Sequence, residues 1–206
     1  MAERFTDHLR HKVAGIWEAQ HQHPFVRGIG DGTLRLERFK FWLRQDYVFL
    51  IEYARLLALA AARSPHLETM IRFATLLKET VETEMNLHRA YAAEFEISHE
   101  ELERETPTPT TQAYTDFLLR VAGTGDFAEL AAALLPCMWG FSEIGQRLAA
   151  QSAPGEKRYV KWIAMYSSTE FAELAQWCRD LLDGLAAGLP ELMPFRVSHM
   201  EIPLTP

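Results

Sequence analysis

The feature that most constrains the fold is one long apolar segment, "YVFLIEYARLLALAAA", at residues 47–62. It forms the second half of a helix that the periodicity predicts over about 35–62. A helix that is apolar most of the way round is usually central to its domain. Strand signals are nearly absent, since the chain has no Asn-Gly hairpin turn and no sustained alternation of apolar and polar residues. The sequence therefore predicts an all-α protein.

Further helices are expected on either side of this segment, joined by short connections. The stretch "HPFVRGIGDGTL" (23–34) is predicted to be a loop because it carries three glycines and the turn dipeptide Asp31-Gly32. It is not a phosphate-binding loop, since no strand precedes it and no Gly-Lys-Ser/Thr follows. The other predicted helices cover 3–20, 65–95, 111–122, a segment capped by Asp126, and 157–187 with a bend near Ser167. Residues 1–206 are predicted to form a single domain of about seven helices.

Composition excludes several classes of protein. The chain has 21 Lys and Arg against 28 Asp and Glu, so its net charge is −7 and nucleic-acid binding is disfavoured. Two cysteines cannot form a disulfide framework, and the charged start does not resemble a signal peptide. No apolar run is predicted to approach the ~18 residues that span a membrane. We therefore expect a soluble cytoplasmic protein with reduced thiols and no membrane partner.

Asp46 is the first residue that can carry chemistry. On the helix predicted over 35–62, it shares one face with Trp42, Leu43, Phe49 and Leu50. A carboxylate in such an apolar stripe must be paired or hydrogen-bonded, because burying a bare charge costs several kcal/mol. The pattern predicts either a structural ion pair or a binding role, and it does not choose between them.

Cys137 is the second candidate, in the stretch "LLPCMWGFSEIG" at residues 134–145. Pro136 removes a helical hydrogen bond and is predicted to kink the helix beside the thiol. Gly140 and Phe141 lie one turn further along the same face, which would leave a hollow roofed by an aromatic ring. The alternative is a buried, inert cysteine, as we expect for Cys178. No Lys, Arg or His lies within one turn to lower the pKa of the Cys137 thiol.

Glu84 and His88 form a third candidate pair. They lie four residues apart in "VETEMNLHRAY", on one face of a predicted helix, and could supply two metal ligands. A di-iron helical bundle needs a Glu-x-x-His motif on each of two helices, with further glutamates. The other acid and histidine cluster in a predicted helix is Asp7 with His8 and His11, so a second half-site is missing. We expect no metal site here.

Several of these stretches together resemble the TenA/thiaminase II family. They are "HPFVRGIGDGTL", "FKFWLRQDYVFL", "ETEMNLHRAYAAEFEIS", "TPTTQAYTDFLL" and "FAELAAALLPCMWGFSEIG", in the family's order and spacing over roughly residues 5–180. The resemblance implies a haem-oxygenase-like helical bundle, usually a homotetramer, with no metal, haem or other cofactor. It also implies hydrolysis of an aminomethylpyrimidine, or of thiamin, to hydroxymethylpyrimidine in thiamin salvage.

The resemblance assigns roles to individual residues. Cys137 matches the family nucleophile, and Asp46 matches the carboxylate that holds the aminopyrimidine. Phe49, Tyr114 and Tyr166 match the aromatic residues that line the family's pocket. A flat heteroaromatic ring is well held by stacked rings and one carboxylate.

Two positions depart from the family pattern. The family usually has a tyrosine where this chain has Phe141, so one hydroxyl group near the thiol is lost. Family members usually end in a helix that carries a general acid/base glutamate followed by Phe-Trp, whereas this chain ends "FRVSHMEIPLTP". Glu201 is the best match, but Pro203 blocks a helix continuing from it. We therefore expect a shortened C-terminal helix and weaker catalysis, because a general acid/base contributes ~10²–10⁴-fold.

Two other functions remain open from the sequence. The first is a non-catalytic pyrimidine-binding or regulatory protein of the same fold, which the atypical C-terminus would favour. The second is a metal-dependent oxidase on this fold, to which Glu84 and His88 would point.

Overall fold

The computed structural model describes residues 3–187, and these are almost entirely helical, with no strand among them. The fold class predicted from the sequence is therefore confirmed. The described residues divide into two compact units, the first made of residues 3–34 and 131–187, and the second of residues 35–130. Whether these units act as one domain, as the sequence predicts, stays a prediction. The expected shortening of the C-terminal helix lies outside the described residues.

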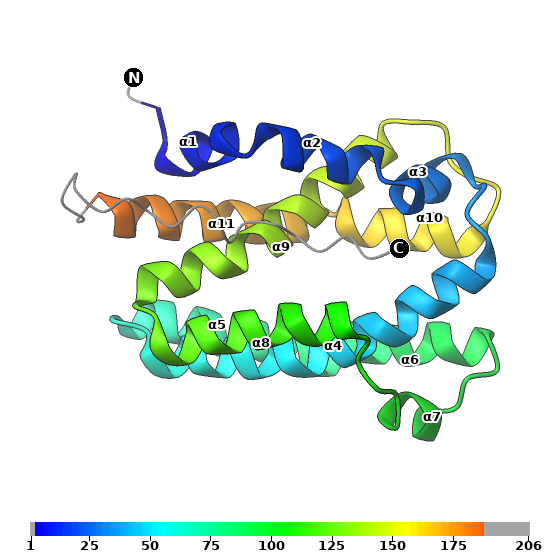
Figure 1. Cartoon of the computed structure of the whole chain (residues 1–206), viewed down its shortest axis with the longest axis horizontal. Coiled ribbons are helices and arrows are strands. Elements are labelled where there is room, and N and C mark those ends of the chain that lie inside the picture. The colour runs from blue at the N-terminus through cyan, green and yellow to red at the C-terminus, as the bar shows by residue number, and fades with distance from the viewer. Residues whose placement is uncertain (1–2, 188–206) are drawn as a thin grey trace. The chain divides into compact units, whose positions relative to one another are not determined.

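The first unit joins the N-terminal helices to the later part of the chain (Figure 1). Its core includes Trp17, Ile29, Trp162 and Leu182, which are all at most 5% exposed. Its helices are α1 (Phe5–Lys12), α2 (Ala14–Gln22), α3 (Pro24–Asp31), α9 (Phe127–Ala149) from residue 131 onward, α10 (Lys157–Tyr166) and α11 (Thr169–Ala186).

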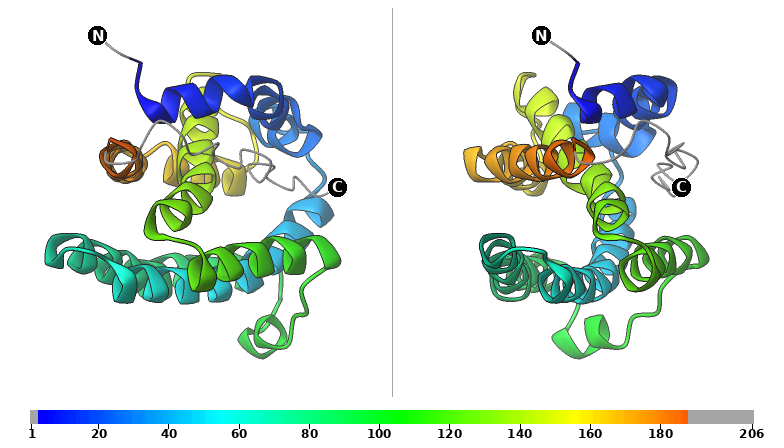
Figure 2. Two further views of the ribbon diagram at one scale, coloured as in Figure 1. Left: turned by 60° about the vertical axis from the view of Figure 1, so that its left-hand side comes forward. Right: turned by 90° about the vertical axis from the view of Figure 1, so that its left-hand side faces the viewer.

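The second unit is built around α4 (Leu36–Arg63), which packs against α5 and α8 (Figure 2). The α4 side chains that are fully buried include Leu43, Tyr47 and Leu56, each 0% exposed. This confirms the helix predicted over 35–62 and its central place. The other elements are α5 (Leu67–Glu79), the π-helical turn η1 (Thr80–Glu84), α6 (Met85–Glu94), α7 (His99–Glu103) and α8 (Pro109–Thr124).

The glycine-bearing stretch 23–34 is mostly a helix, and the loop prediction was wrong. His23 caps α3 by accepting a hydrogen bond from the Phe25 amide, and Pro24 occupies the first turn, where a missing N–H costs nothing. Gly32 ends the helix in the left-handed conformation, with φ at 76°. A Cβ on Gly28 would lie 2.9 Å from the Leu34 Cβ, so this glycine serves close packing rather than a turn.

Helix boundaries also differ from the predicted ranges. The first predicted helix divides at Val13 into α1 and α2. The helix predicted over 65–95 is interrupted by η1, and α7 was not predicted. The bend predicted near Ser167 is a true break, because Ser168 caps α11 by accepting a hydrogen bond from the Phe171 amide.

α9 begins as predicted and contains Pro136, the proline beside Cys137. Asp126 accepts a hydrogen bond from the Glu129 amide at 2.8 Å, and the Glu129 carboxylate accepts one from the Asp126 amide at 2.9 Å. This reciprocal capping box starts the helix. Pro136 lies inside it, and the helical assignment continues to Ala149. The predicted kink at Pro136 stays a prediction.

α9 also corrects the expectation about apolar runs. By length and composition alone it passes the test for a membrane span, with a mean hydropathy of 1.2 over 18 residues. However, 61% of that window is buried within the fold, as in the core helix of a folded domain. One such helix is weak evidence for a membrane span.

Candidate active site

The carboxylate of Asp46 is held by a histidine of the same unit. Asp46 lies on α4 and His88 on α6, and the His88 Nε2 atom is 2.7 Å from the Asp46 Oδ2 atom. The His88 side chain is 1% exposed and that of Asp46 is 12% exposed. His88 is the hydrogen-bond partner of Asp46 among residues 3–187. Asp46, predicted to need a partner on the apolar face of α4, is therefore paired with a buried imidazole.

The other ring nitrogen of His88 binds the backbone. Its Nδ1 atom is 3.0 Å from the carbonyl oxygen of Glu84, one turn earlier in the chain. Burial lowers the pKa of His88, but the hydrogen bond and charge of Asp46, together with the charge of Glu84, outweigh it and raise the pKa overall. The Trp42 ring lies 5.8 Å from the imidazole, centroid to centroid, and limits its movement.

Glu84 stands at the end of η1, in a π-helical turn. Burial, and then the negative charge of Asp46, raise the pKa of Glu84 to about 7, while the charge of His88 opposes this. The Met85 amide closes the turn by donating to the Thr80 carbonyl, five residues back. Such turns are rare and often lie at functional sites. The sequence paired Glu84 with His88 but gave no sign of the π turn or of the link to Asp46.

Two aromatic residues predicted to line the pocket do lie together in the second unit. The rings of Phe49 on α4 and Tyr114 on α8 are parallel within 2°, with centroids 5.6 Å apart. Tyr53 also stacks on Phe49, with ring centroids 5.4 Å apart. A ligand ring fits between two parallel rings only if these are about 7 Å apart. The rings here are closer than that, so a ligand would have to stack on an outer face of the group.

Gln45, which the sequence analysis missed, holds α8 in register with α4. Its side-chain oxygen accepts from the Thr108 amide and the Thr111 hydroxyl, each at 2.8 Å, and its amide nitrogen donates to the Thr106 carbonyl at 3.1 Å. Thr108 is the N-cap of α8, the helix that carries Tyr114. These three hydrogen bonds hold the buried Gln45 side chain and fix the start of α8 against α4. In the sequence, the position of Gln45 next to Asp46 was the one indication that it supports the site.

Cys137, Phe141 and Tyr166 belong to the first unit. Cys137 is half-buried on α9 and is not in a disulfide, whereas Cys178 is buried on α11, as expected for a structural residue. Phe141 follows one turn after Cys137, and its ring centroid is 4.9 Å from that of Tyr166. Trp162 completes the aromatic cluster, 4.6 Å from Tyr166.

A glycine sets how closely α9 approaches the end of α10. A Cβ built on Gly145 would lie 2.4 Å from the carbonyl carbon of Tyr166, so only glycine fits. Tyr166 is 4% exposed, which is more buried than a residue that simply lines an open pocket. The structure thus brings Phe141 and Tyr166 together, and separately Phe49 and Tyr114. Glu201 lies outside the described residues.

The metal alternative does not fit the geometry around His88. Both ring nitrogens are engaged, one by a carbonyl oxygen and one by a carboxylate. Within residues 3–187, no three His, Cys, Asp or Glu side chains are grouped so as to hold a metal ion. A metal ligand here would have to break one of the two hydrogen bonds that orient the ring.

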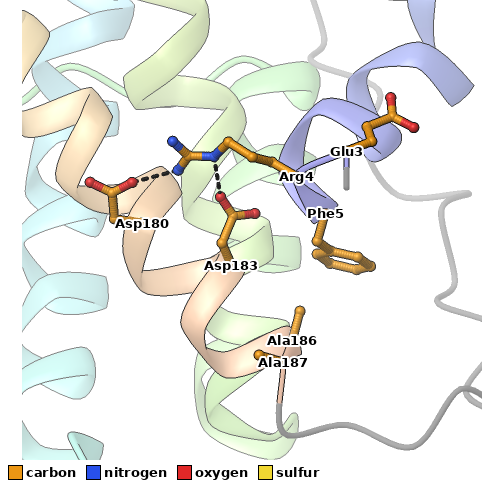
Figure 3. A pocket seen from close by; sticks show the side chains of 7 residues that line it. All are labelled: Glu3, Arg4, Phe5, Asp180, Asp183, Ala186 and Ala187. Carbon is orange, nitrogen blue, oxygen red and sulfur yellow. Dashed lines mark hydrogen bonds and ion pairs between the residues drawn. The ribbon is translucent and has the colours of Figure 1, made fainter. Parts of the chain in front are cut away.

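An open surface pocket lies elsewhere in the first unit, between the start of α1 and the end of α11 (Figure 3). Arg4 reaches across it, with its Nε atom 2.6 Å from Asp183 and its Nη2 atom 2.5 Å from Asp180. Its lining contains none of the predicted site residues. We regard it as a structural contact between α1 and α11.

The fold and these side chains define an all-helical protein with an oriented carboxylate–imidazole pair, two groups of packed aromatic rings and a half-buried thiol. The chain belongs to the TENA/THI-4/PQQC family, whose model matches residues 10–192. The family predicted from the sequence motifs is therefore confirmed.

Characterised relatives extend this result. The chain is 48% identical to the aminopyrimidine aminohydrolase of Halalkalibacterium halodurans over 186 residues, covering 90% of this chain and 83% of that protein. It is 39% identical to the aminopyrimidine aminohydrolase of Bacillus subtilis, covering 91% of this chain and 79% of that protein. Among solved structures, a TenA family transcription regulator from Silicibacter sp. TM1040 matches with a TM-score of 0.85 and 34% identity, covering 95% of this chain and 87% of that one.

Proposed function

We propose that this chain is an aminopyrimidine aminohydrolase of thiamin salvage. It would hydrolyse the bond between the pyrimidinylmethyl carbon and nitrogen of an aminomethylpyrimidine, or of thiamin, and release hydroxymethylpyrimidine. The observation that carries the proposal is the Asp46 carboxylate, oriented by His88 on a face that also carries Phe49. The proposal draws further support from the 48% identity to a relative with that name.

Asp46 is proposed to bind the amino edge of the ring. A carboxylate accepts the hydrogen bonds that an aminopyrimidine donates, and the bond from His88 fixes its orientation. Phe49 and Tyr114 would supply a flat apolar surface on which the ring stacks. Phe141 and Tyr166 are proposed as further aromatic contacts of the substrate.

Cys137 is proposed as the nucleophile. Its thiolate would add to a ring carbon of the pyrimidine, which breaks the aromaticity and allows the protonated exocyclic nitrogen to leave as an amine. Water would then add to the methylene carbon, and departure of the thiolate would restore the ring and the enzyme. Cys137 is half-buried on α9 and is not in a disulfide, which supports this role.

Glu201 is proposed as the general acid that protonates the departing nitrogen, and as the base that later takes a proton from water. If this is correct, Glu201→Gln lowers kcat by about 10²-fold or more. An unchanged kcat would remove Glu201 from the mechanism. We also propose that the protein is a cytoplasmic homotetramer that needs no cofactor.

The rival function is a non-catalytic binding or regulatory protein. It has one specific point in its favour, because the solved relative from Silicibacter is described as a transcription regulator. Ammonia release from an aminomethylpyrimidine, followed with the purified full chain, separates the two functions. Steady release at a rate proportional to protein supports the hydrolase. Absence of release, with micromolar binding of hydroxymethylpyrimidine retained, would support the rival.

The oxidase alternative is tested by elemental analysis of the same preparation. We expect no stoichiometric iron or manganese, and ammonia release that is unchanged after treatment with a chelator. Stoichiometric metal whose removal abolishes the activity would contradict the proposed mechanism.

A further inference from the structure

The protons on His88 can be assigned from its two hydrogen bonds. The Nδ1 atom is 3.0 Å from the carbonyl oxygen of Glu84. A carbonyl oxygen only accepts hydrogen bonds, so Nδ1 must carry a hydrogen. If the imidazole were neutral, the Nε2 atom would therefore present a lone pair toward Asp46.

That lone pair would face a carboxylate oxygen at 2.7 Å, which is the distance of a strong, charge-assisted hydrogen bond. Two acceptors do not approach so closely without a proton between them. Because its surroundings raise the pKa of His88, we place that proton on the imidazole, which then donates to the Asp46 carboxylate. One lone pair of Oδ2 is used in this way, and the rest of the carboxylate remains an acceptor.

The amino edge of an aminopyrimidine is not fully complementary to an acceptor. When the amino group stands next to a ring nitrogen, the edge offers one N–H donor and, beside it, one ring lone pair. The donor matches Asp46, but the ring lone pair would face the second carboxylate oxygen. Placing two acceptors together in a desolvated site is unfavourable, because neither lone pair then receives a hydrogen bond.

One additional proton removes this conflict. We propose that the Asp46 site binds the aminopyrimidine as a cation, with the extra proton on the ring nitrogen that faces Asp46, so that binding is coupled to the uptake of one proton. This inference rests on the proposed function. A protonated ring carries less electron density and is a better acceptor for a thiolate, so the same proton would also favour the addition step.

We assign the supply of that proton to Glu84, whose backbone carbonyl is hydrogen-bonded to the ring of His88. The charged groups that act on the pKa of His88 are Asp46 and Glu84. Since burial and the charge of Asp46 raise the pKa of Glu84 to about 7, it holds a proton part of the time at neutral pH. A proton passing from Glu84 to the ring would leave the summed charge of the cluster and ligand unchanged.

The test counts protons by calorimetry. Hydroxymethylpyrimidine, the product, is titrated into the full chain in buffers of different ionisation enthalpy, at a pH at which the free ligand is shown by ultraviolet titration to be neutral. In Glu84→Gln, which cannot supply the proton, we expect uptake of about one proton from solution per ligand bound. Wild type should take up less, because Glu84 provides part of it.

The matched variant adds Asp46→Asn to Glu84→Gln. The asparagine oxygen can accept from His88 while its amide donates to the ring lone pair, so a neutral ring is satisfied and uptake should fall close to zero. Circular dichroism checks that both variants fold. Should a variant not fold, the nitrogen-15 shift of a labelled ring nitrogen, measured in complex with wild type, reports protonation directly.

The outcomes separate this inference from the function on which it rests. Tight binding to Glu84→Gln with no proton uptake, or a bound ring nitrogen with the neutral shift, would overturn the inference and leave the aminohydrolase proposal in place. Absence of binding to wild type would overturn both. Uptake of one proton that is lost on adding Asp46→Asn would support the cationic ring.

Discussion

Asp46 shows how much a single residue in an apolar helical stripe can indicate. Its neighbours on α4 predicted that the carboxylate must be paired, and the structure supplies His88 as that partner. The sequence left open whether the pair was structural or functional. The hydrogen bond from His88 to the Glu84 carbonyl could not be predicted, because it depends on a π-helical turn that no residue pattern announces.

Glu84 should make stability depend on pH around neutrality. Its pKa in the folded state, about 7, lies above its ordinary value of 4.5, so the folded protein favours the protonated form. That contribution is complete below about pH 4.5 and is lost as the pH rises through 7. Relative to Glu84→Gln, wild type should lose on the order of 3 kcal/mol at most between pH 5 and 8.

Urea denaturation at a series of pH values measures this difference. Glu82→Gln is the control, because Glu82 lies on the same π-helical turn but is exposed. A constant difference between wild type and Glu84→Gln across this range would show that the surroundings of Glu84 do not raise its pKa.

Phe49 should contribute to substrate affinity through its ring. Phe49→Ala removes one half of the parallel pair with Tyr114 and is expected to raise the Kd for hydroxymethylpyrimidine about tenfold, since aromatic stacking contributes roughly 0.5–1.5 kcal/mol. Phe41→Ala, an exposed phenylalanine on the same helix, is the control and should leave the Kd unchanged. Equal effects of the two substitutions would remove Phe49 from the binding surface.

At the level of elements, glycines decide where helices approach closely. The sequence predicted a loop for 23–34 because glycines and Asp-Gly usually mark turns, yet α3 forms there. Tertiary packing overrides the local preference, since Gly28 and Gly30 meet Leu34 and Leu148 at distances that a Cβ would make too short. The turn propensities of single residues carry no information about these tertiary neighbours.

Gly145 provides a direct test at this scale. In Gly145→Ala the new Cβ would lie 2.4 Å from Tyr166 backbone, so α9 or the end of α10 must shift, at a cost of about 1–3 kcal/mol. In Gly184→Ala nothing lies within 4 Å, and the better helix propensity should stabilise the protein by about 0.5–1 kcal/mol. Thermal melts compare the two. Similar melting temperatures would contradict the close approach at Gly145.

For the whole molecule, the sequence predicted the class of fold and the family, because long amphipathic helices and spaced motifs survive without knowledge of contacts. Asp46, Phe49 and Tyr114 were predicted as site residues, and the structure places Phe49 and Tyr114 in direct contact. Gln45 was missed, because its role depends on hydrogen bonds to Thr106, Thr108 and Thr111, which lie far from it in the sequence. The supporting contacts of a site are tertiary, and helical periodicity does not encode them.

The oligomeric state is also a property of the whole molecule. Exposed apolar side chains on α5, namely Leu67 at 70% and Ile71 at 56%, are consistent with the proposed homotetramer. Light scattering coupled to size exclusion should give a mass about four times 23.6 kDa. A monomer mass at micromolar concentration would contradict the proposed assembly.

The proposed hydrolysis depends on attack by the Cys137 thiolate, and ammonia release by cysteine variants tests this step. Ammonia release from an aminomethylpyrimidine should be steady in wild type, retained in Cys178→Ala, and reduced by about 10³-fold or more in Cys137→Ser, since a hydroxyl is a much weaker nucleophile than a thiolate. Binding of hydroxymethylpyrimidine should persist in Cys137→Ser. Turnover by Cys137→Ser at the wild-type rate would show that Cys137 is not the nucleophile.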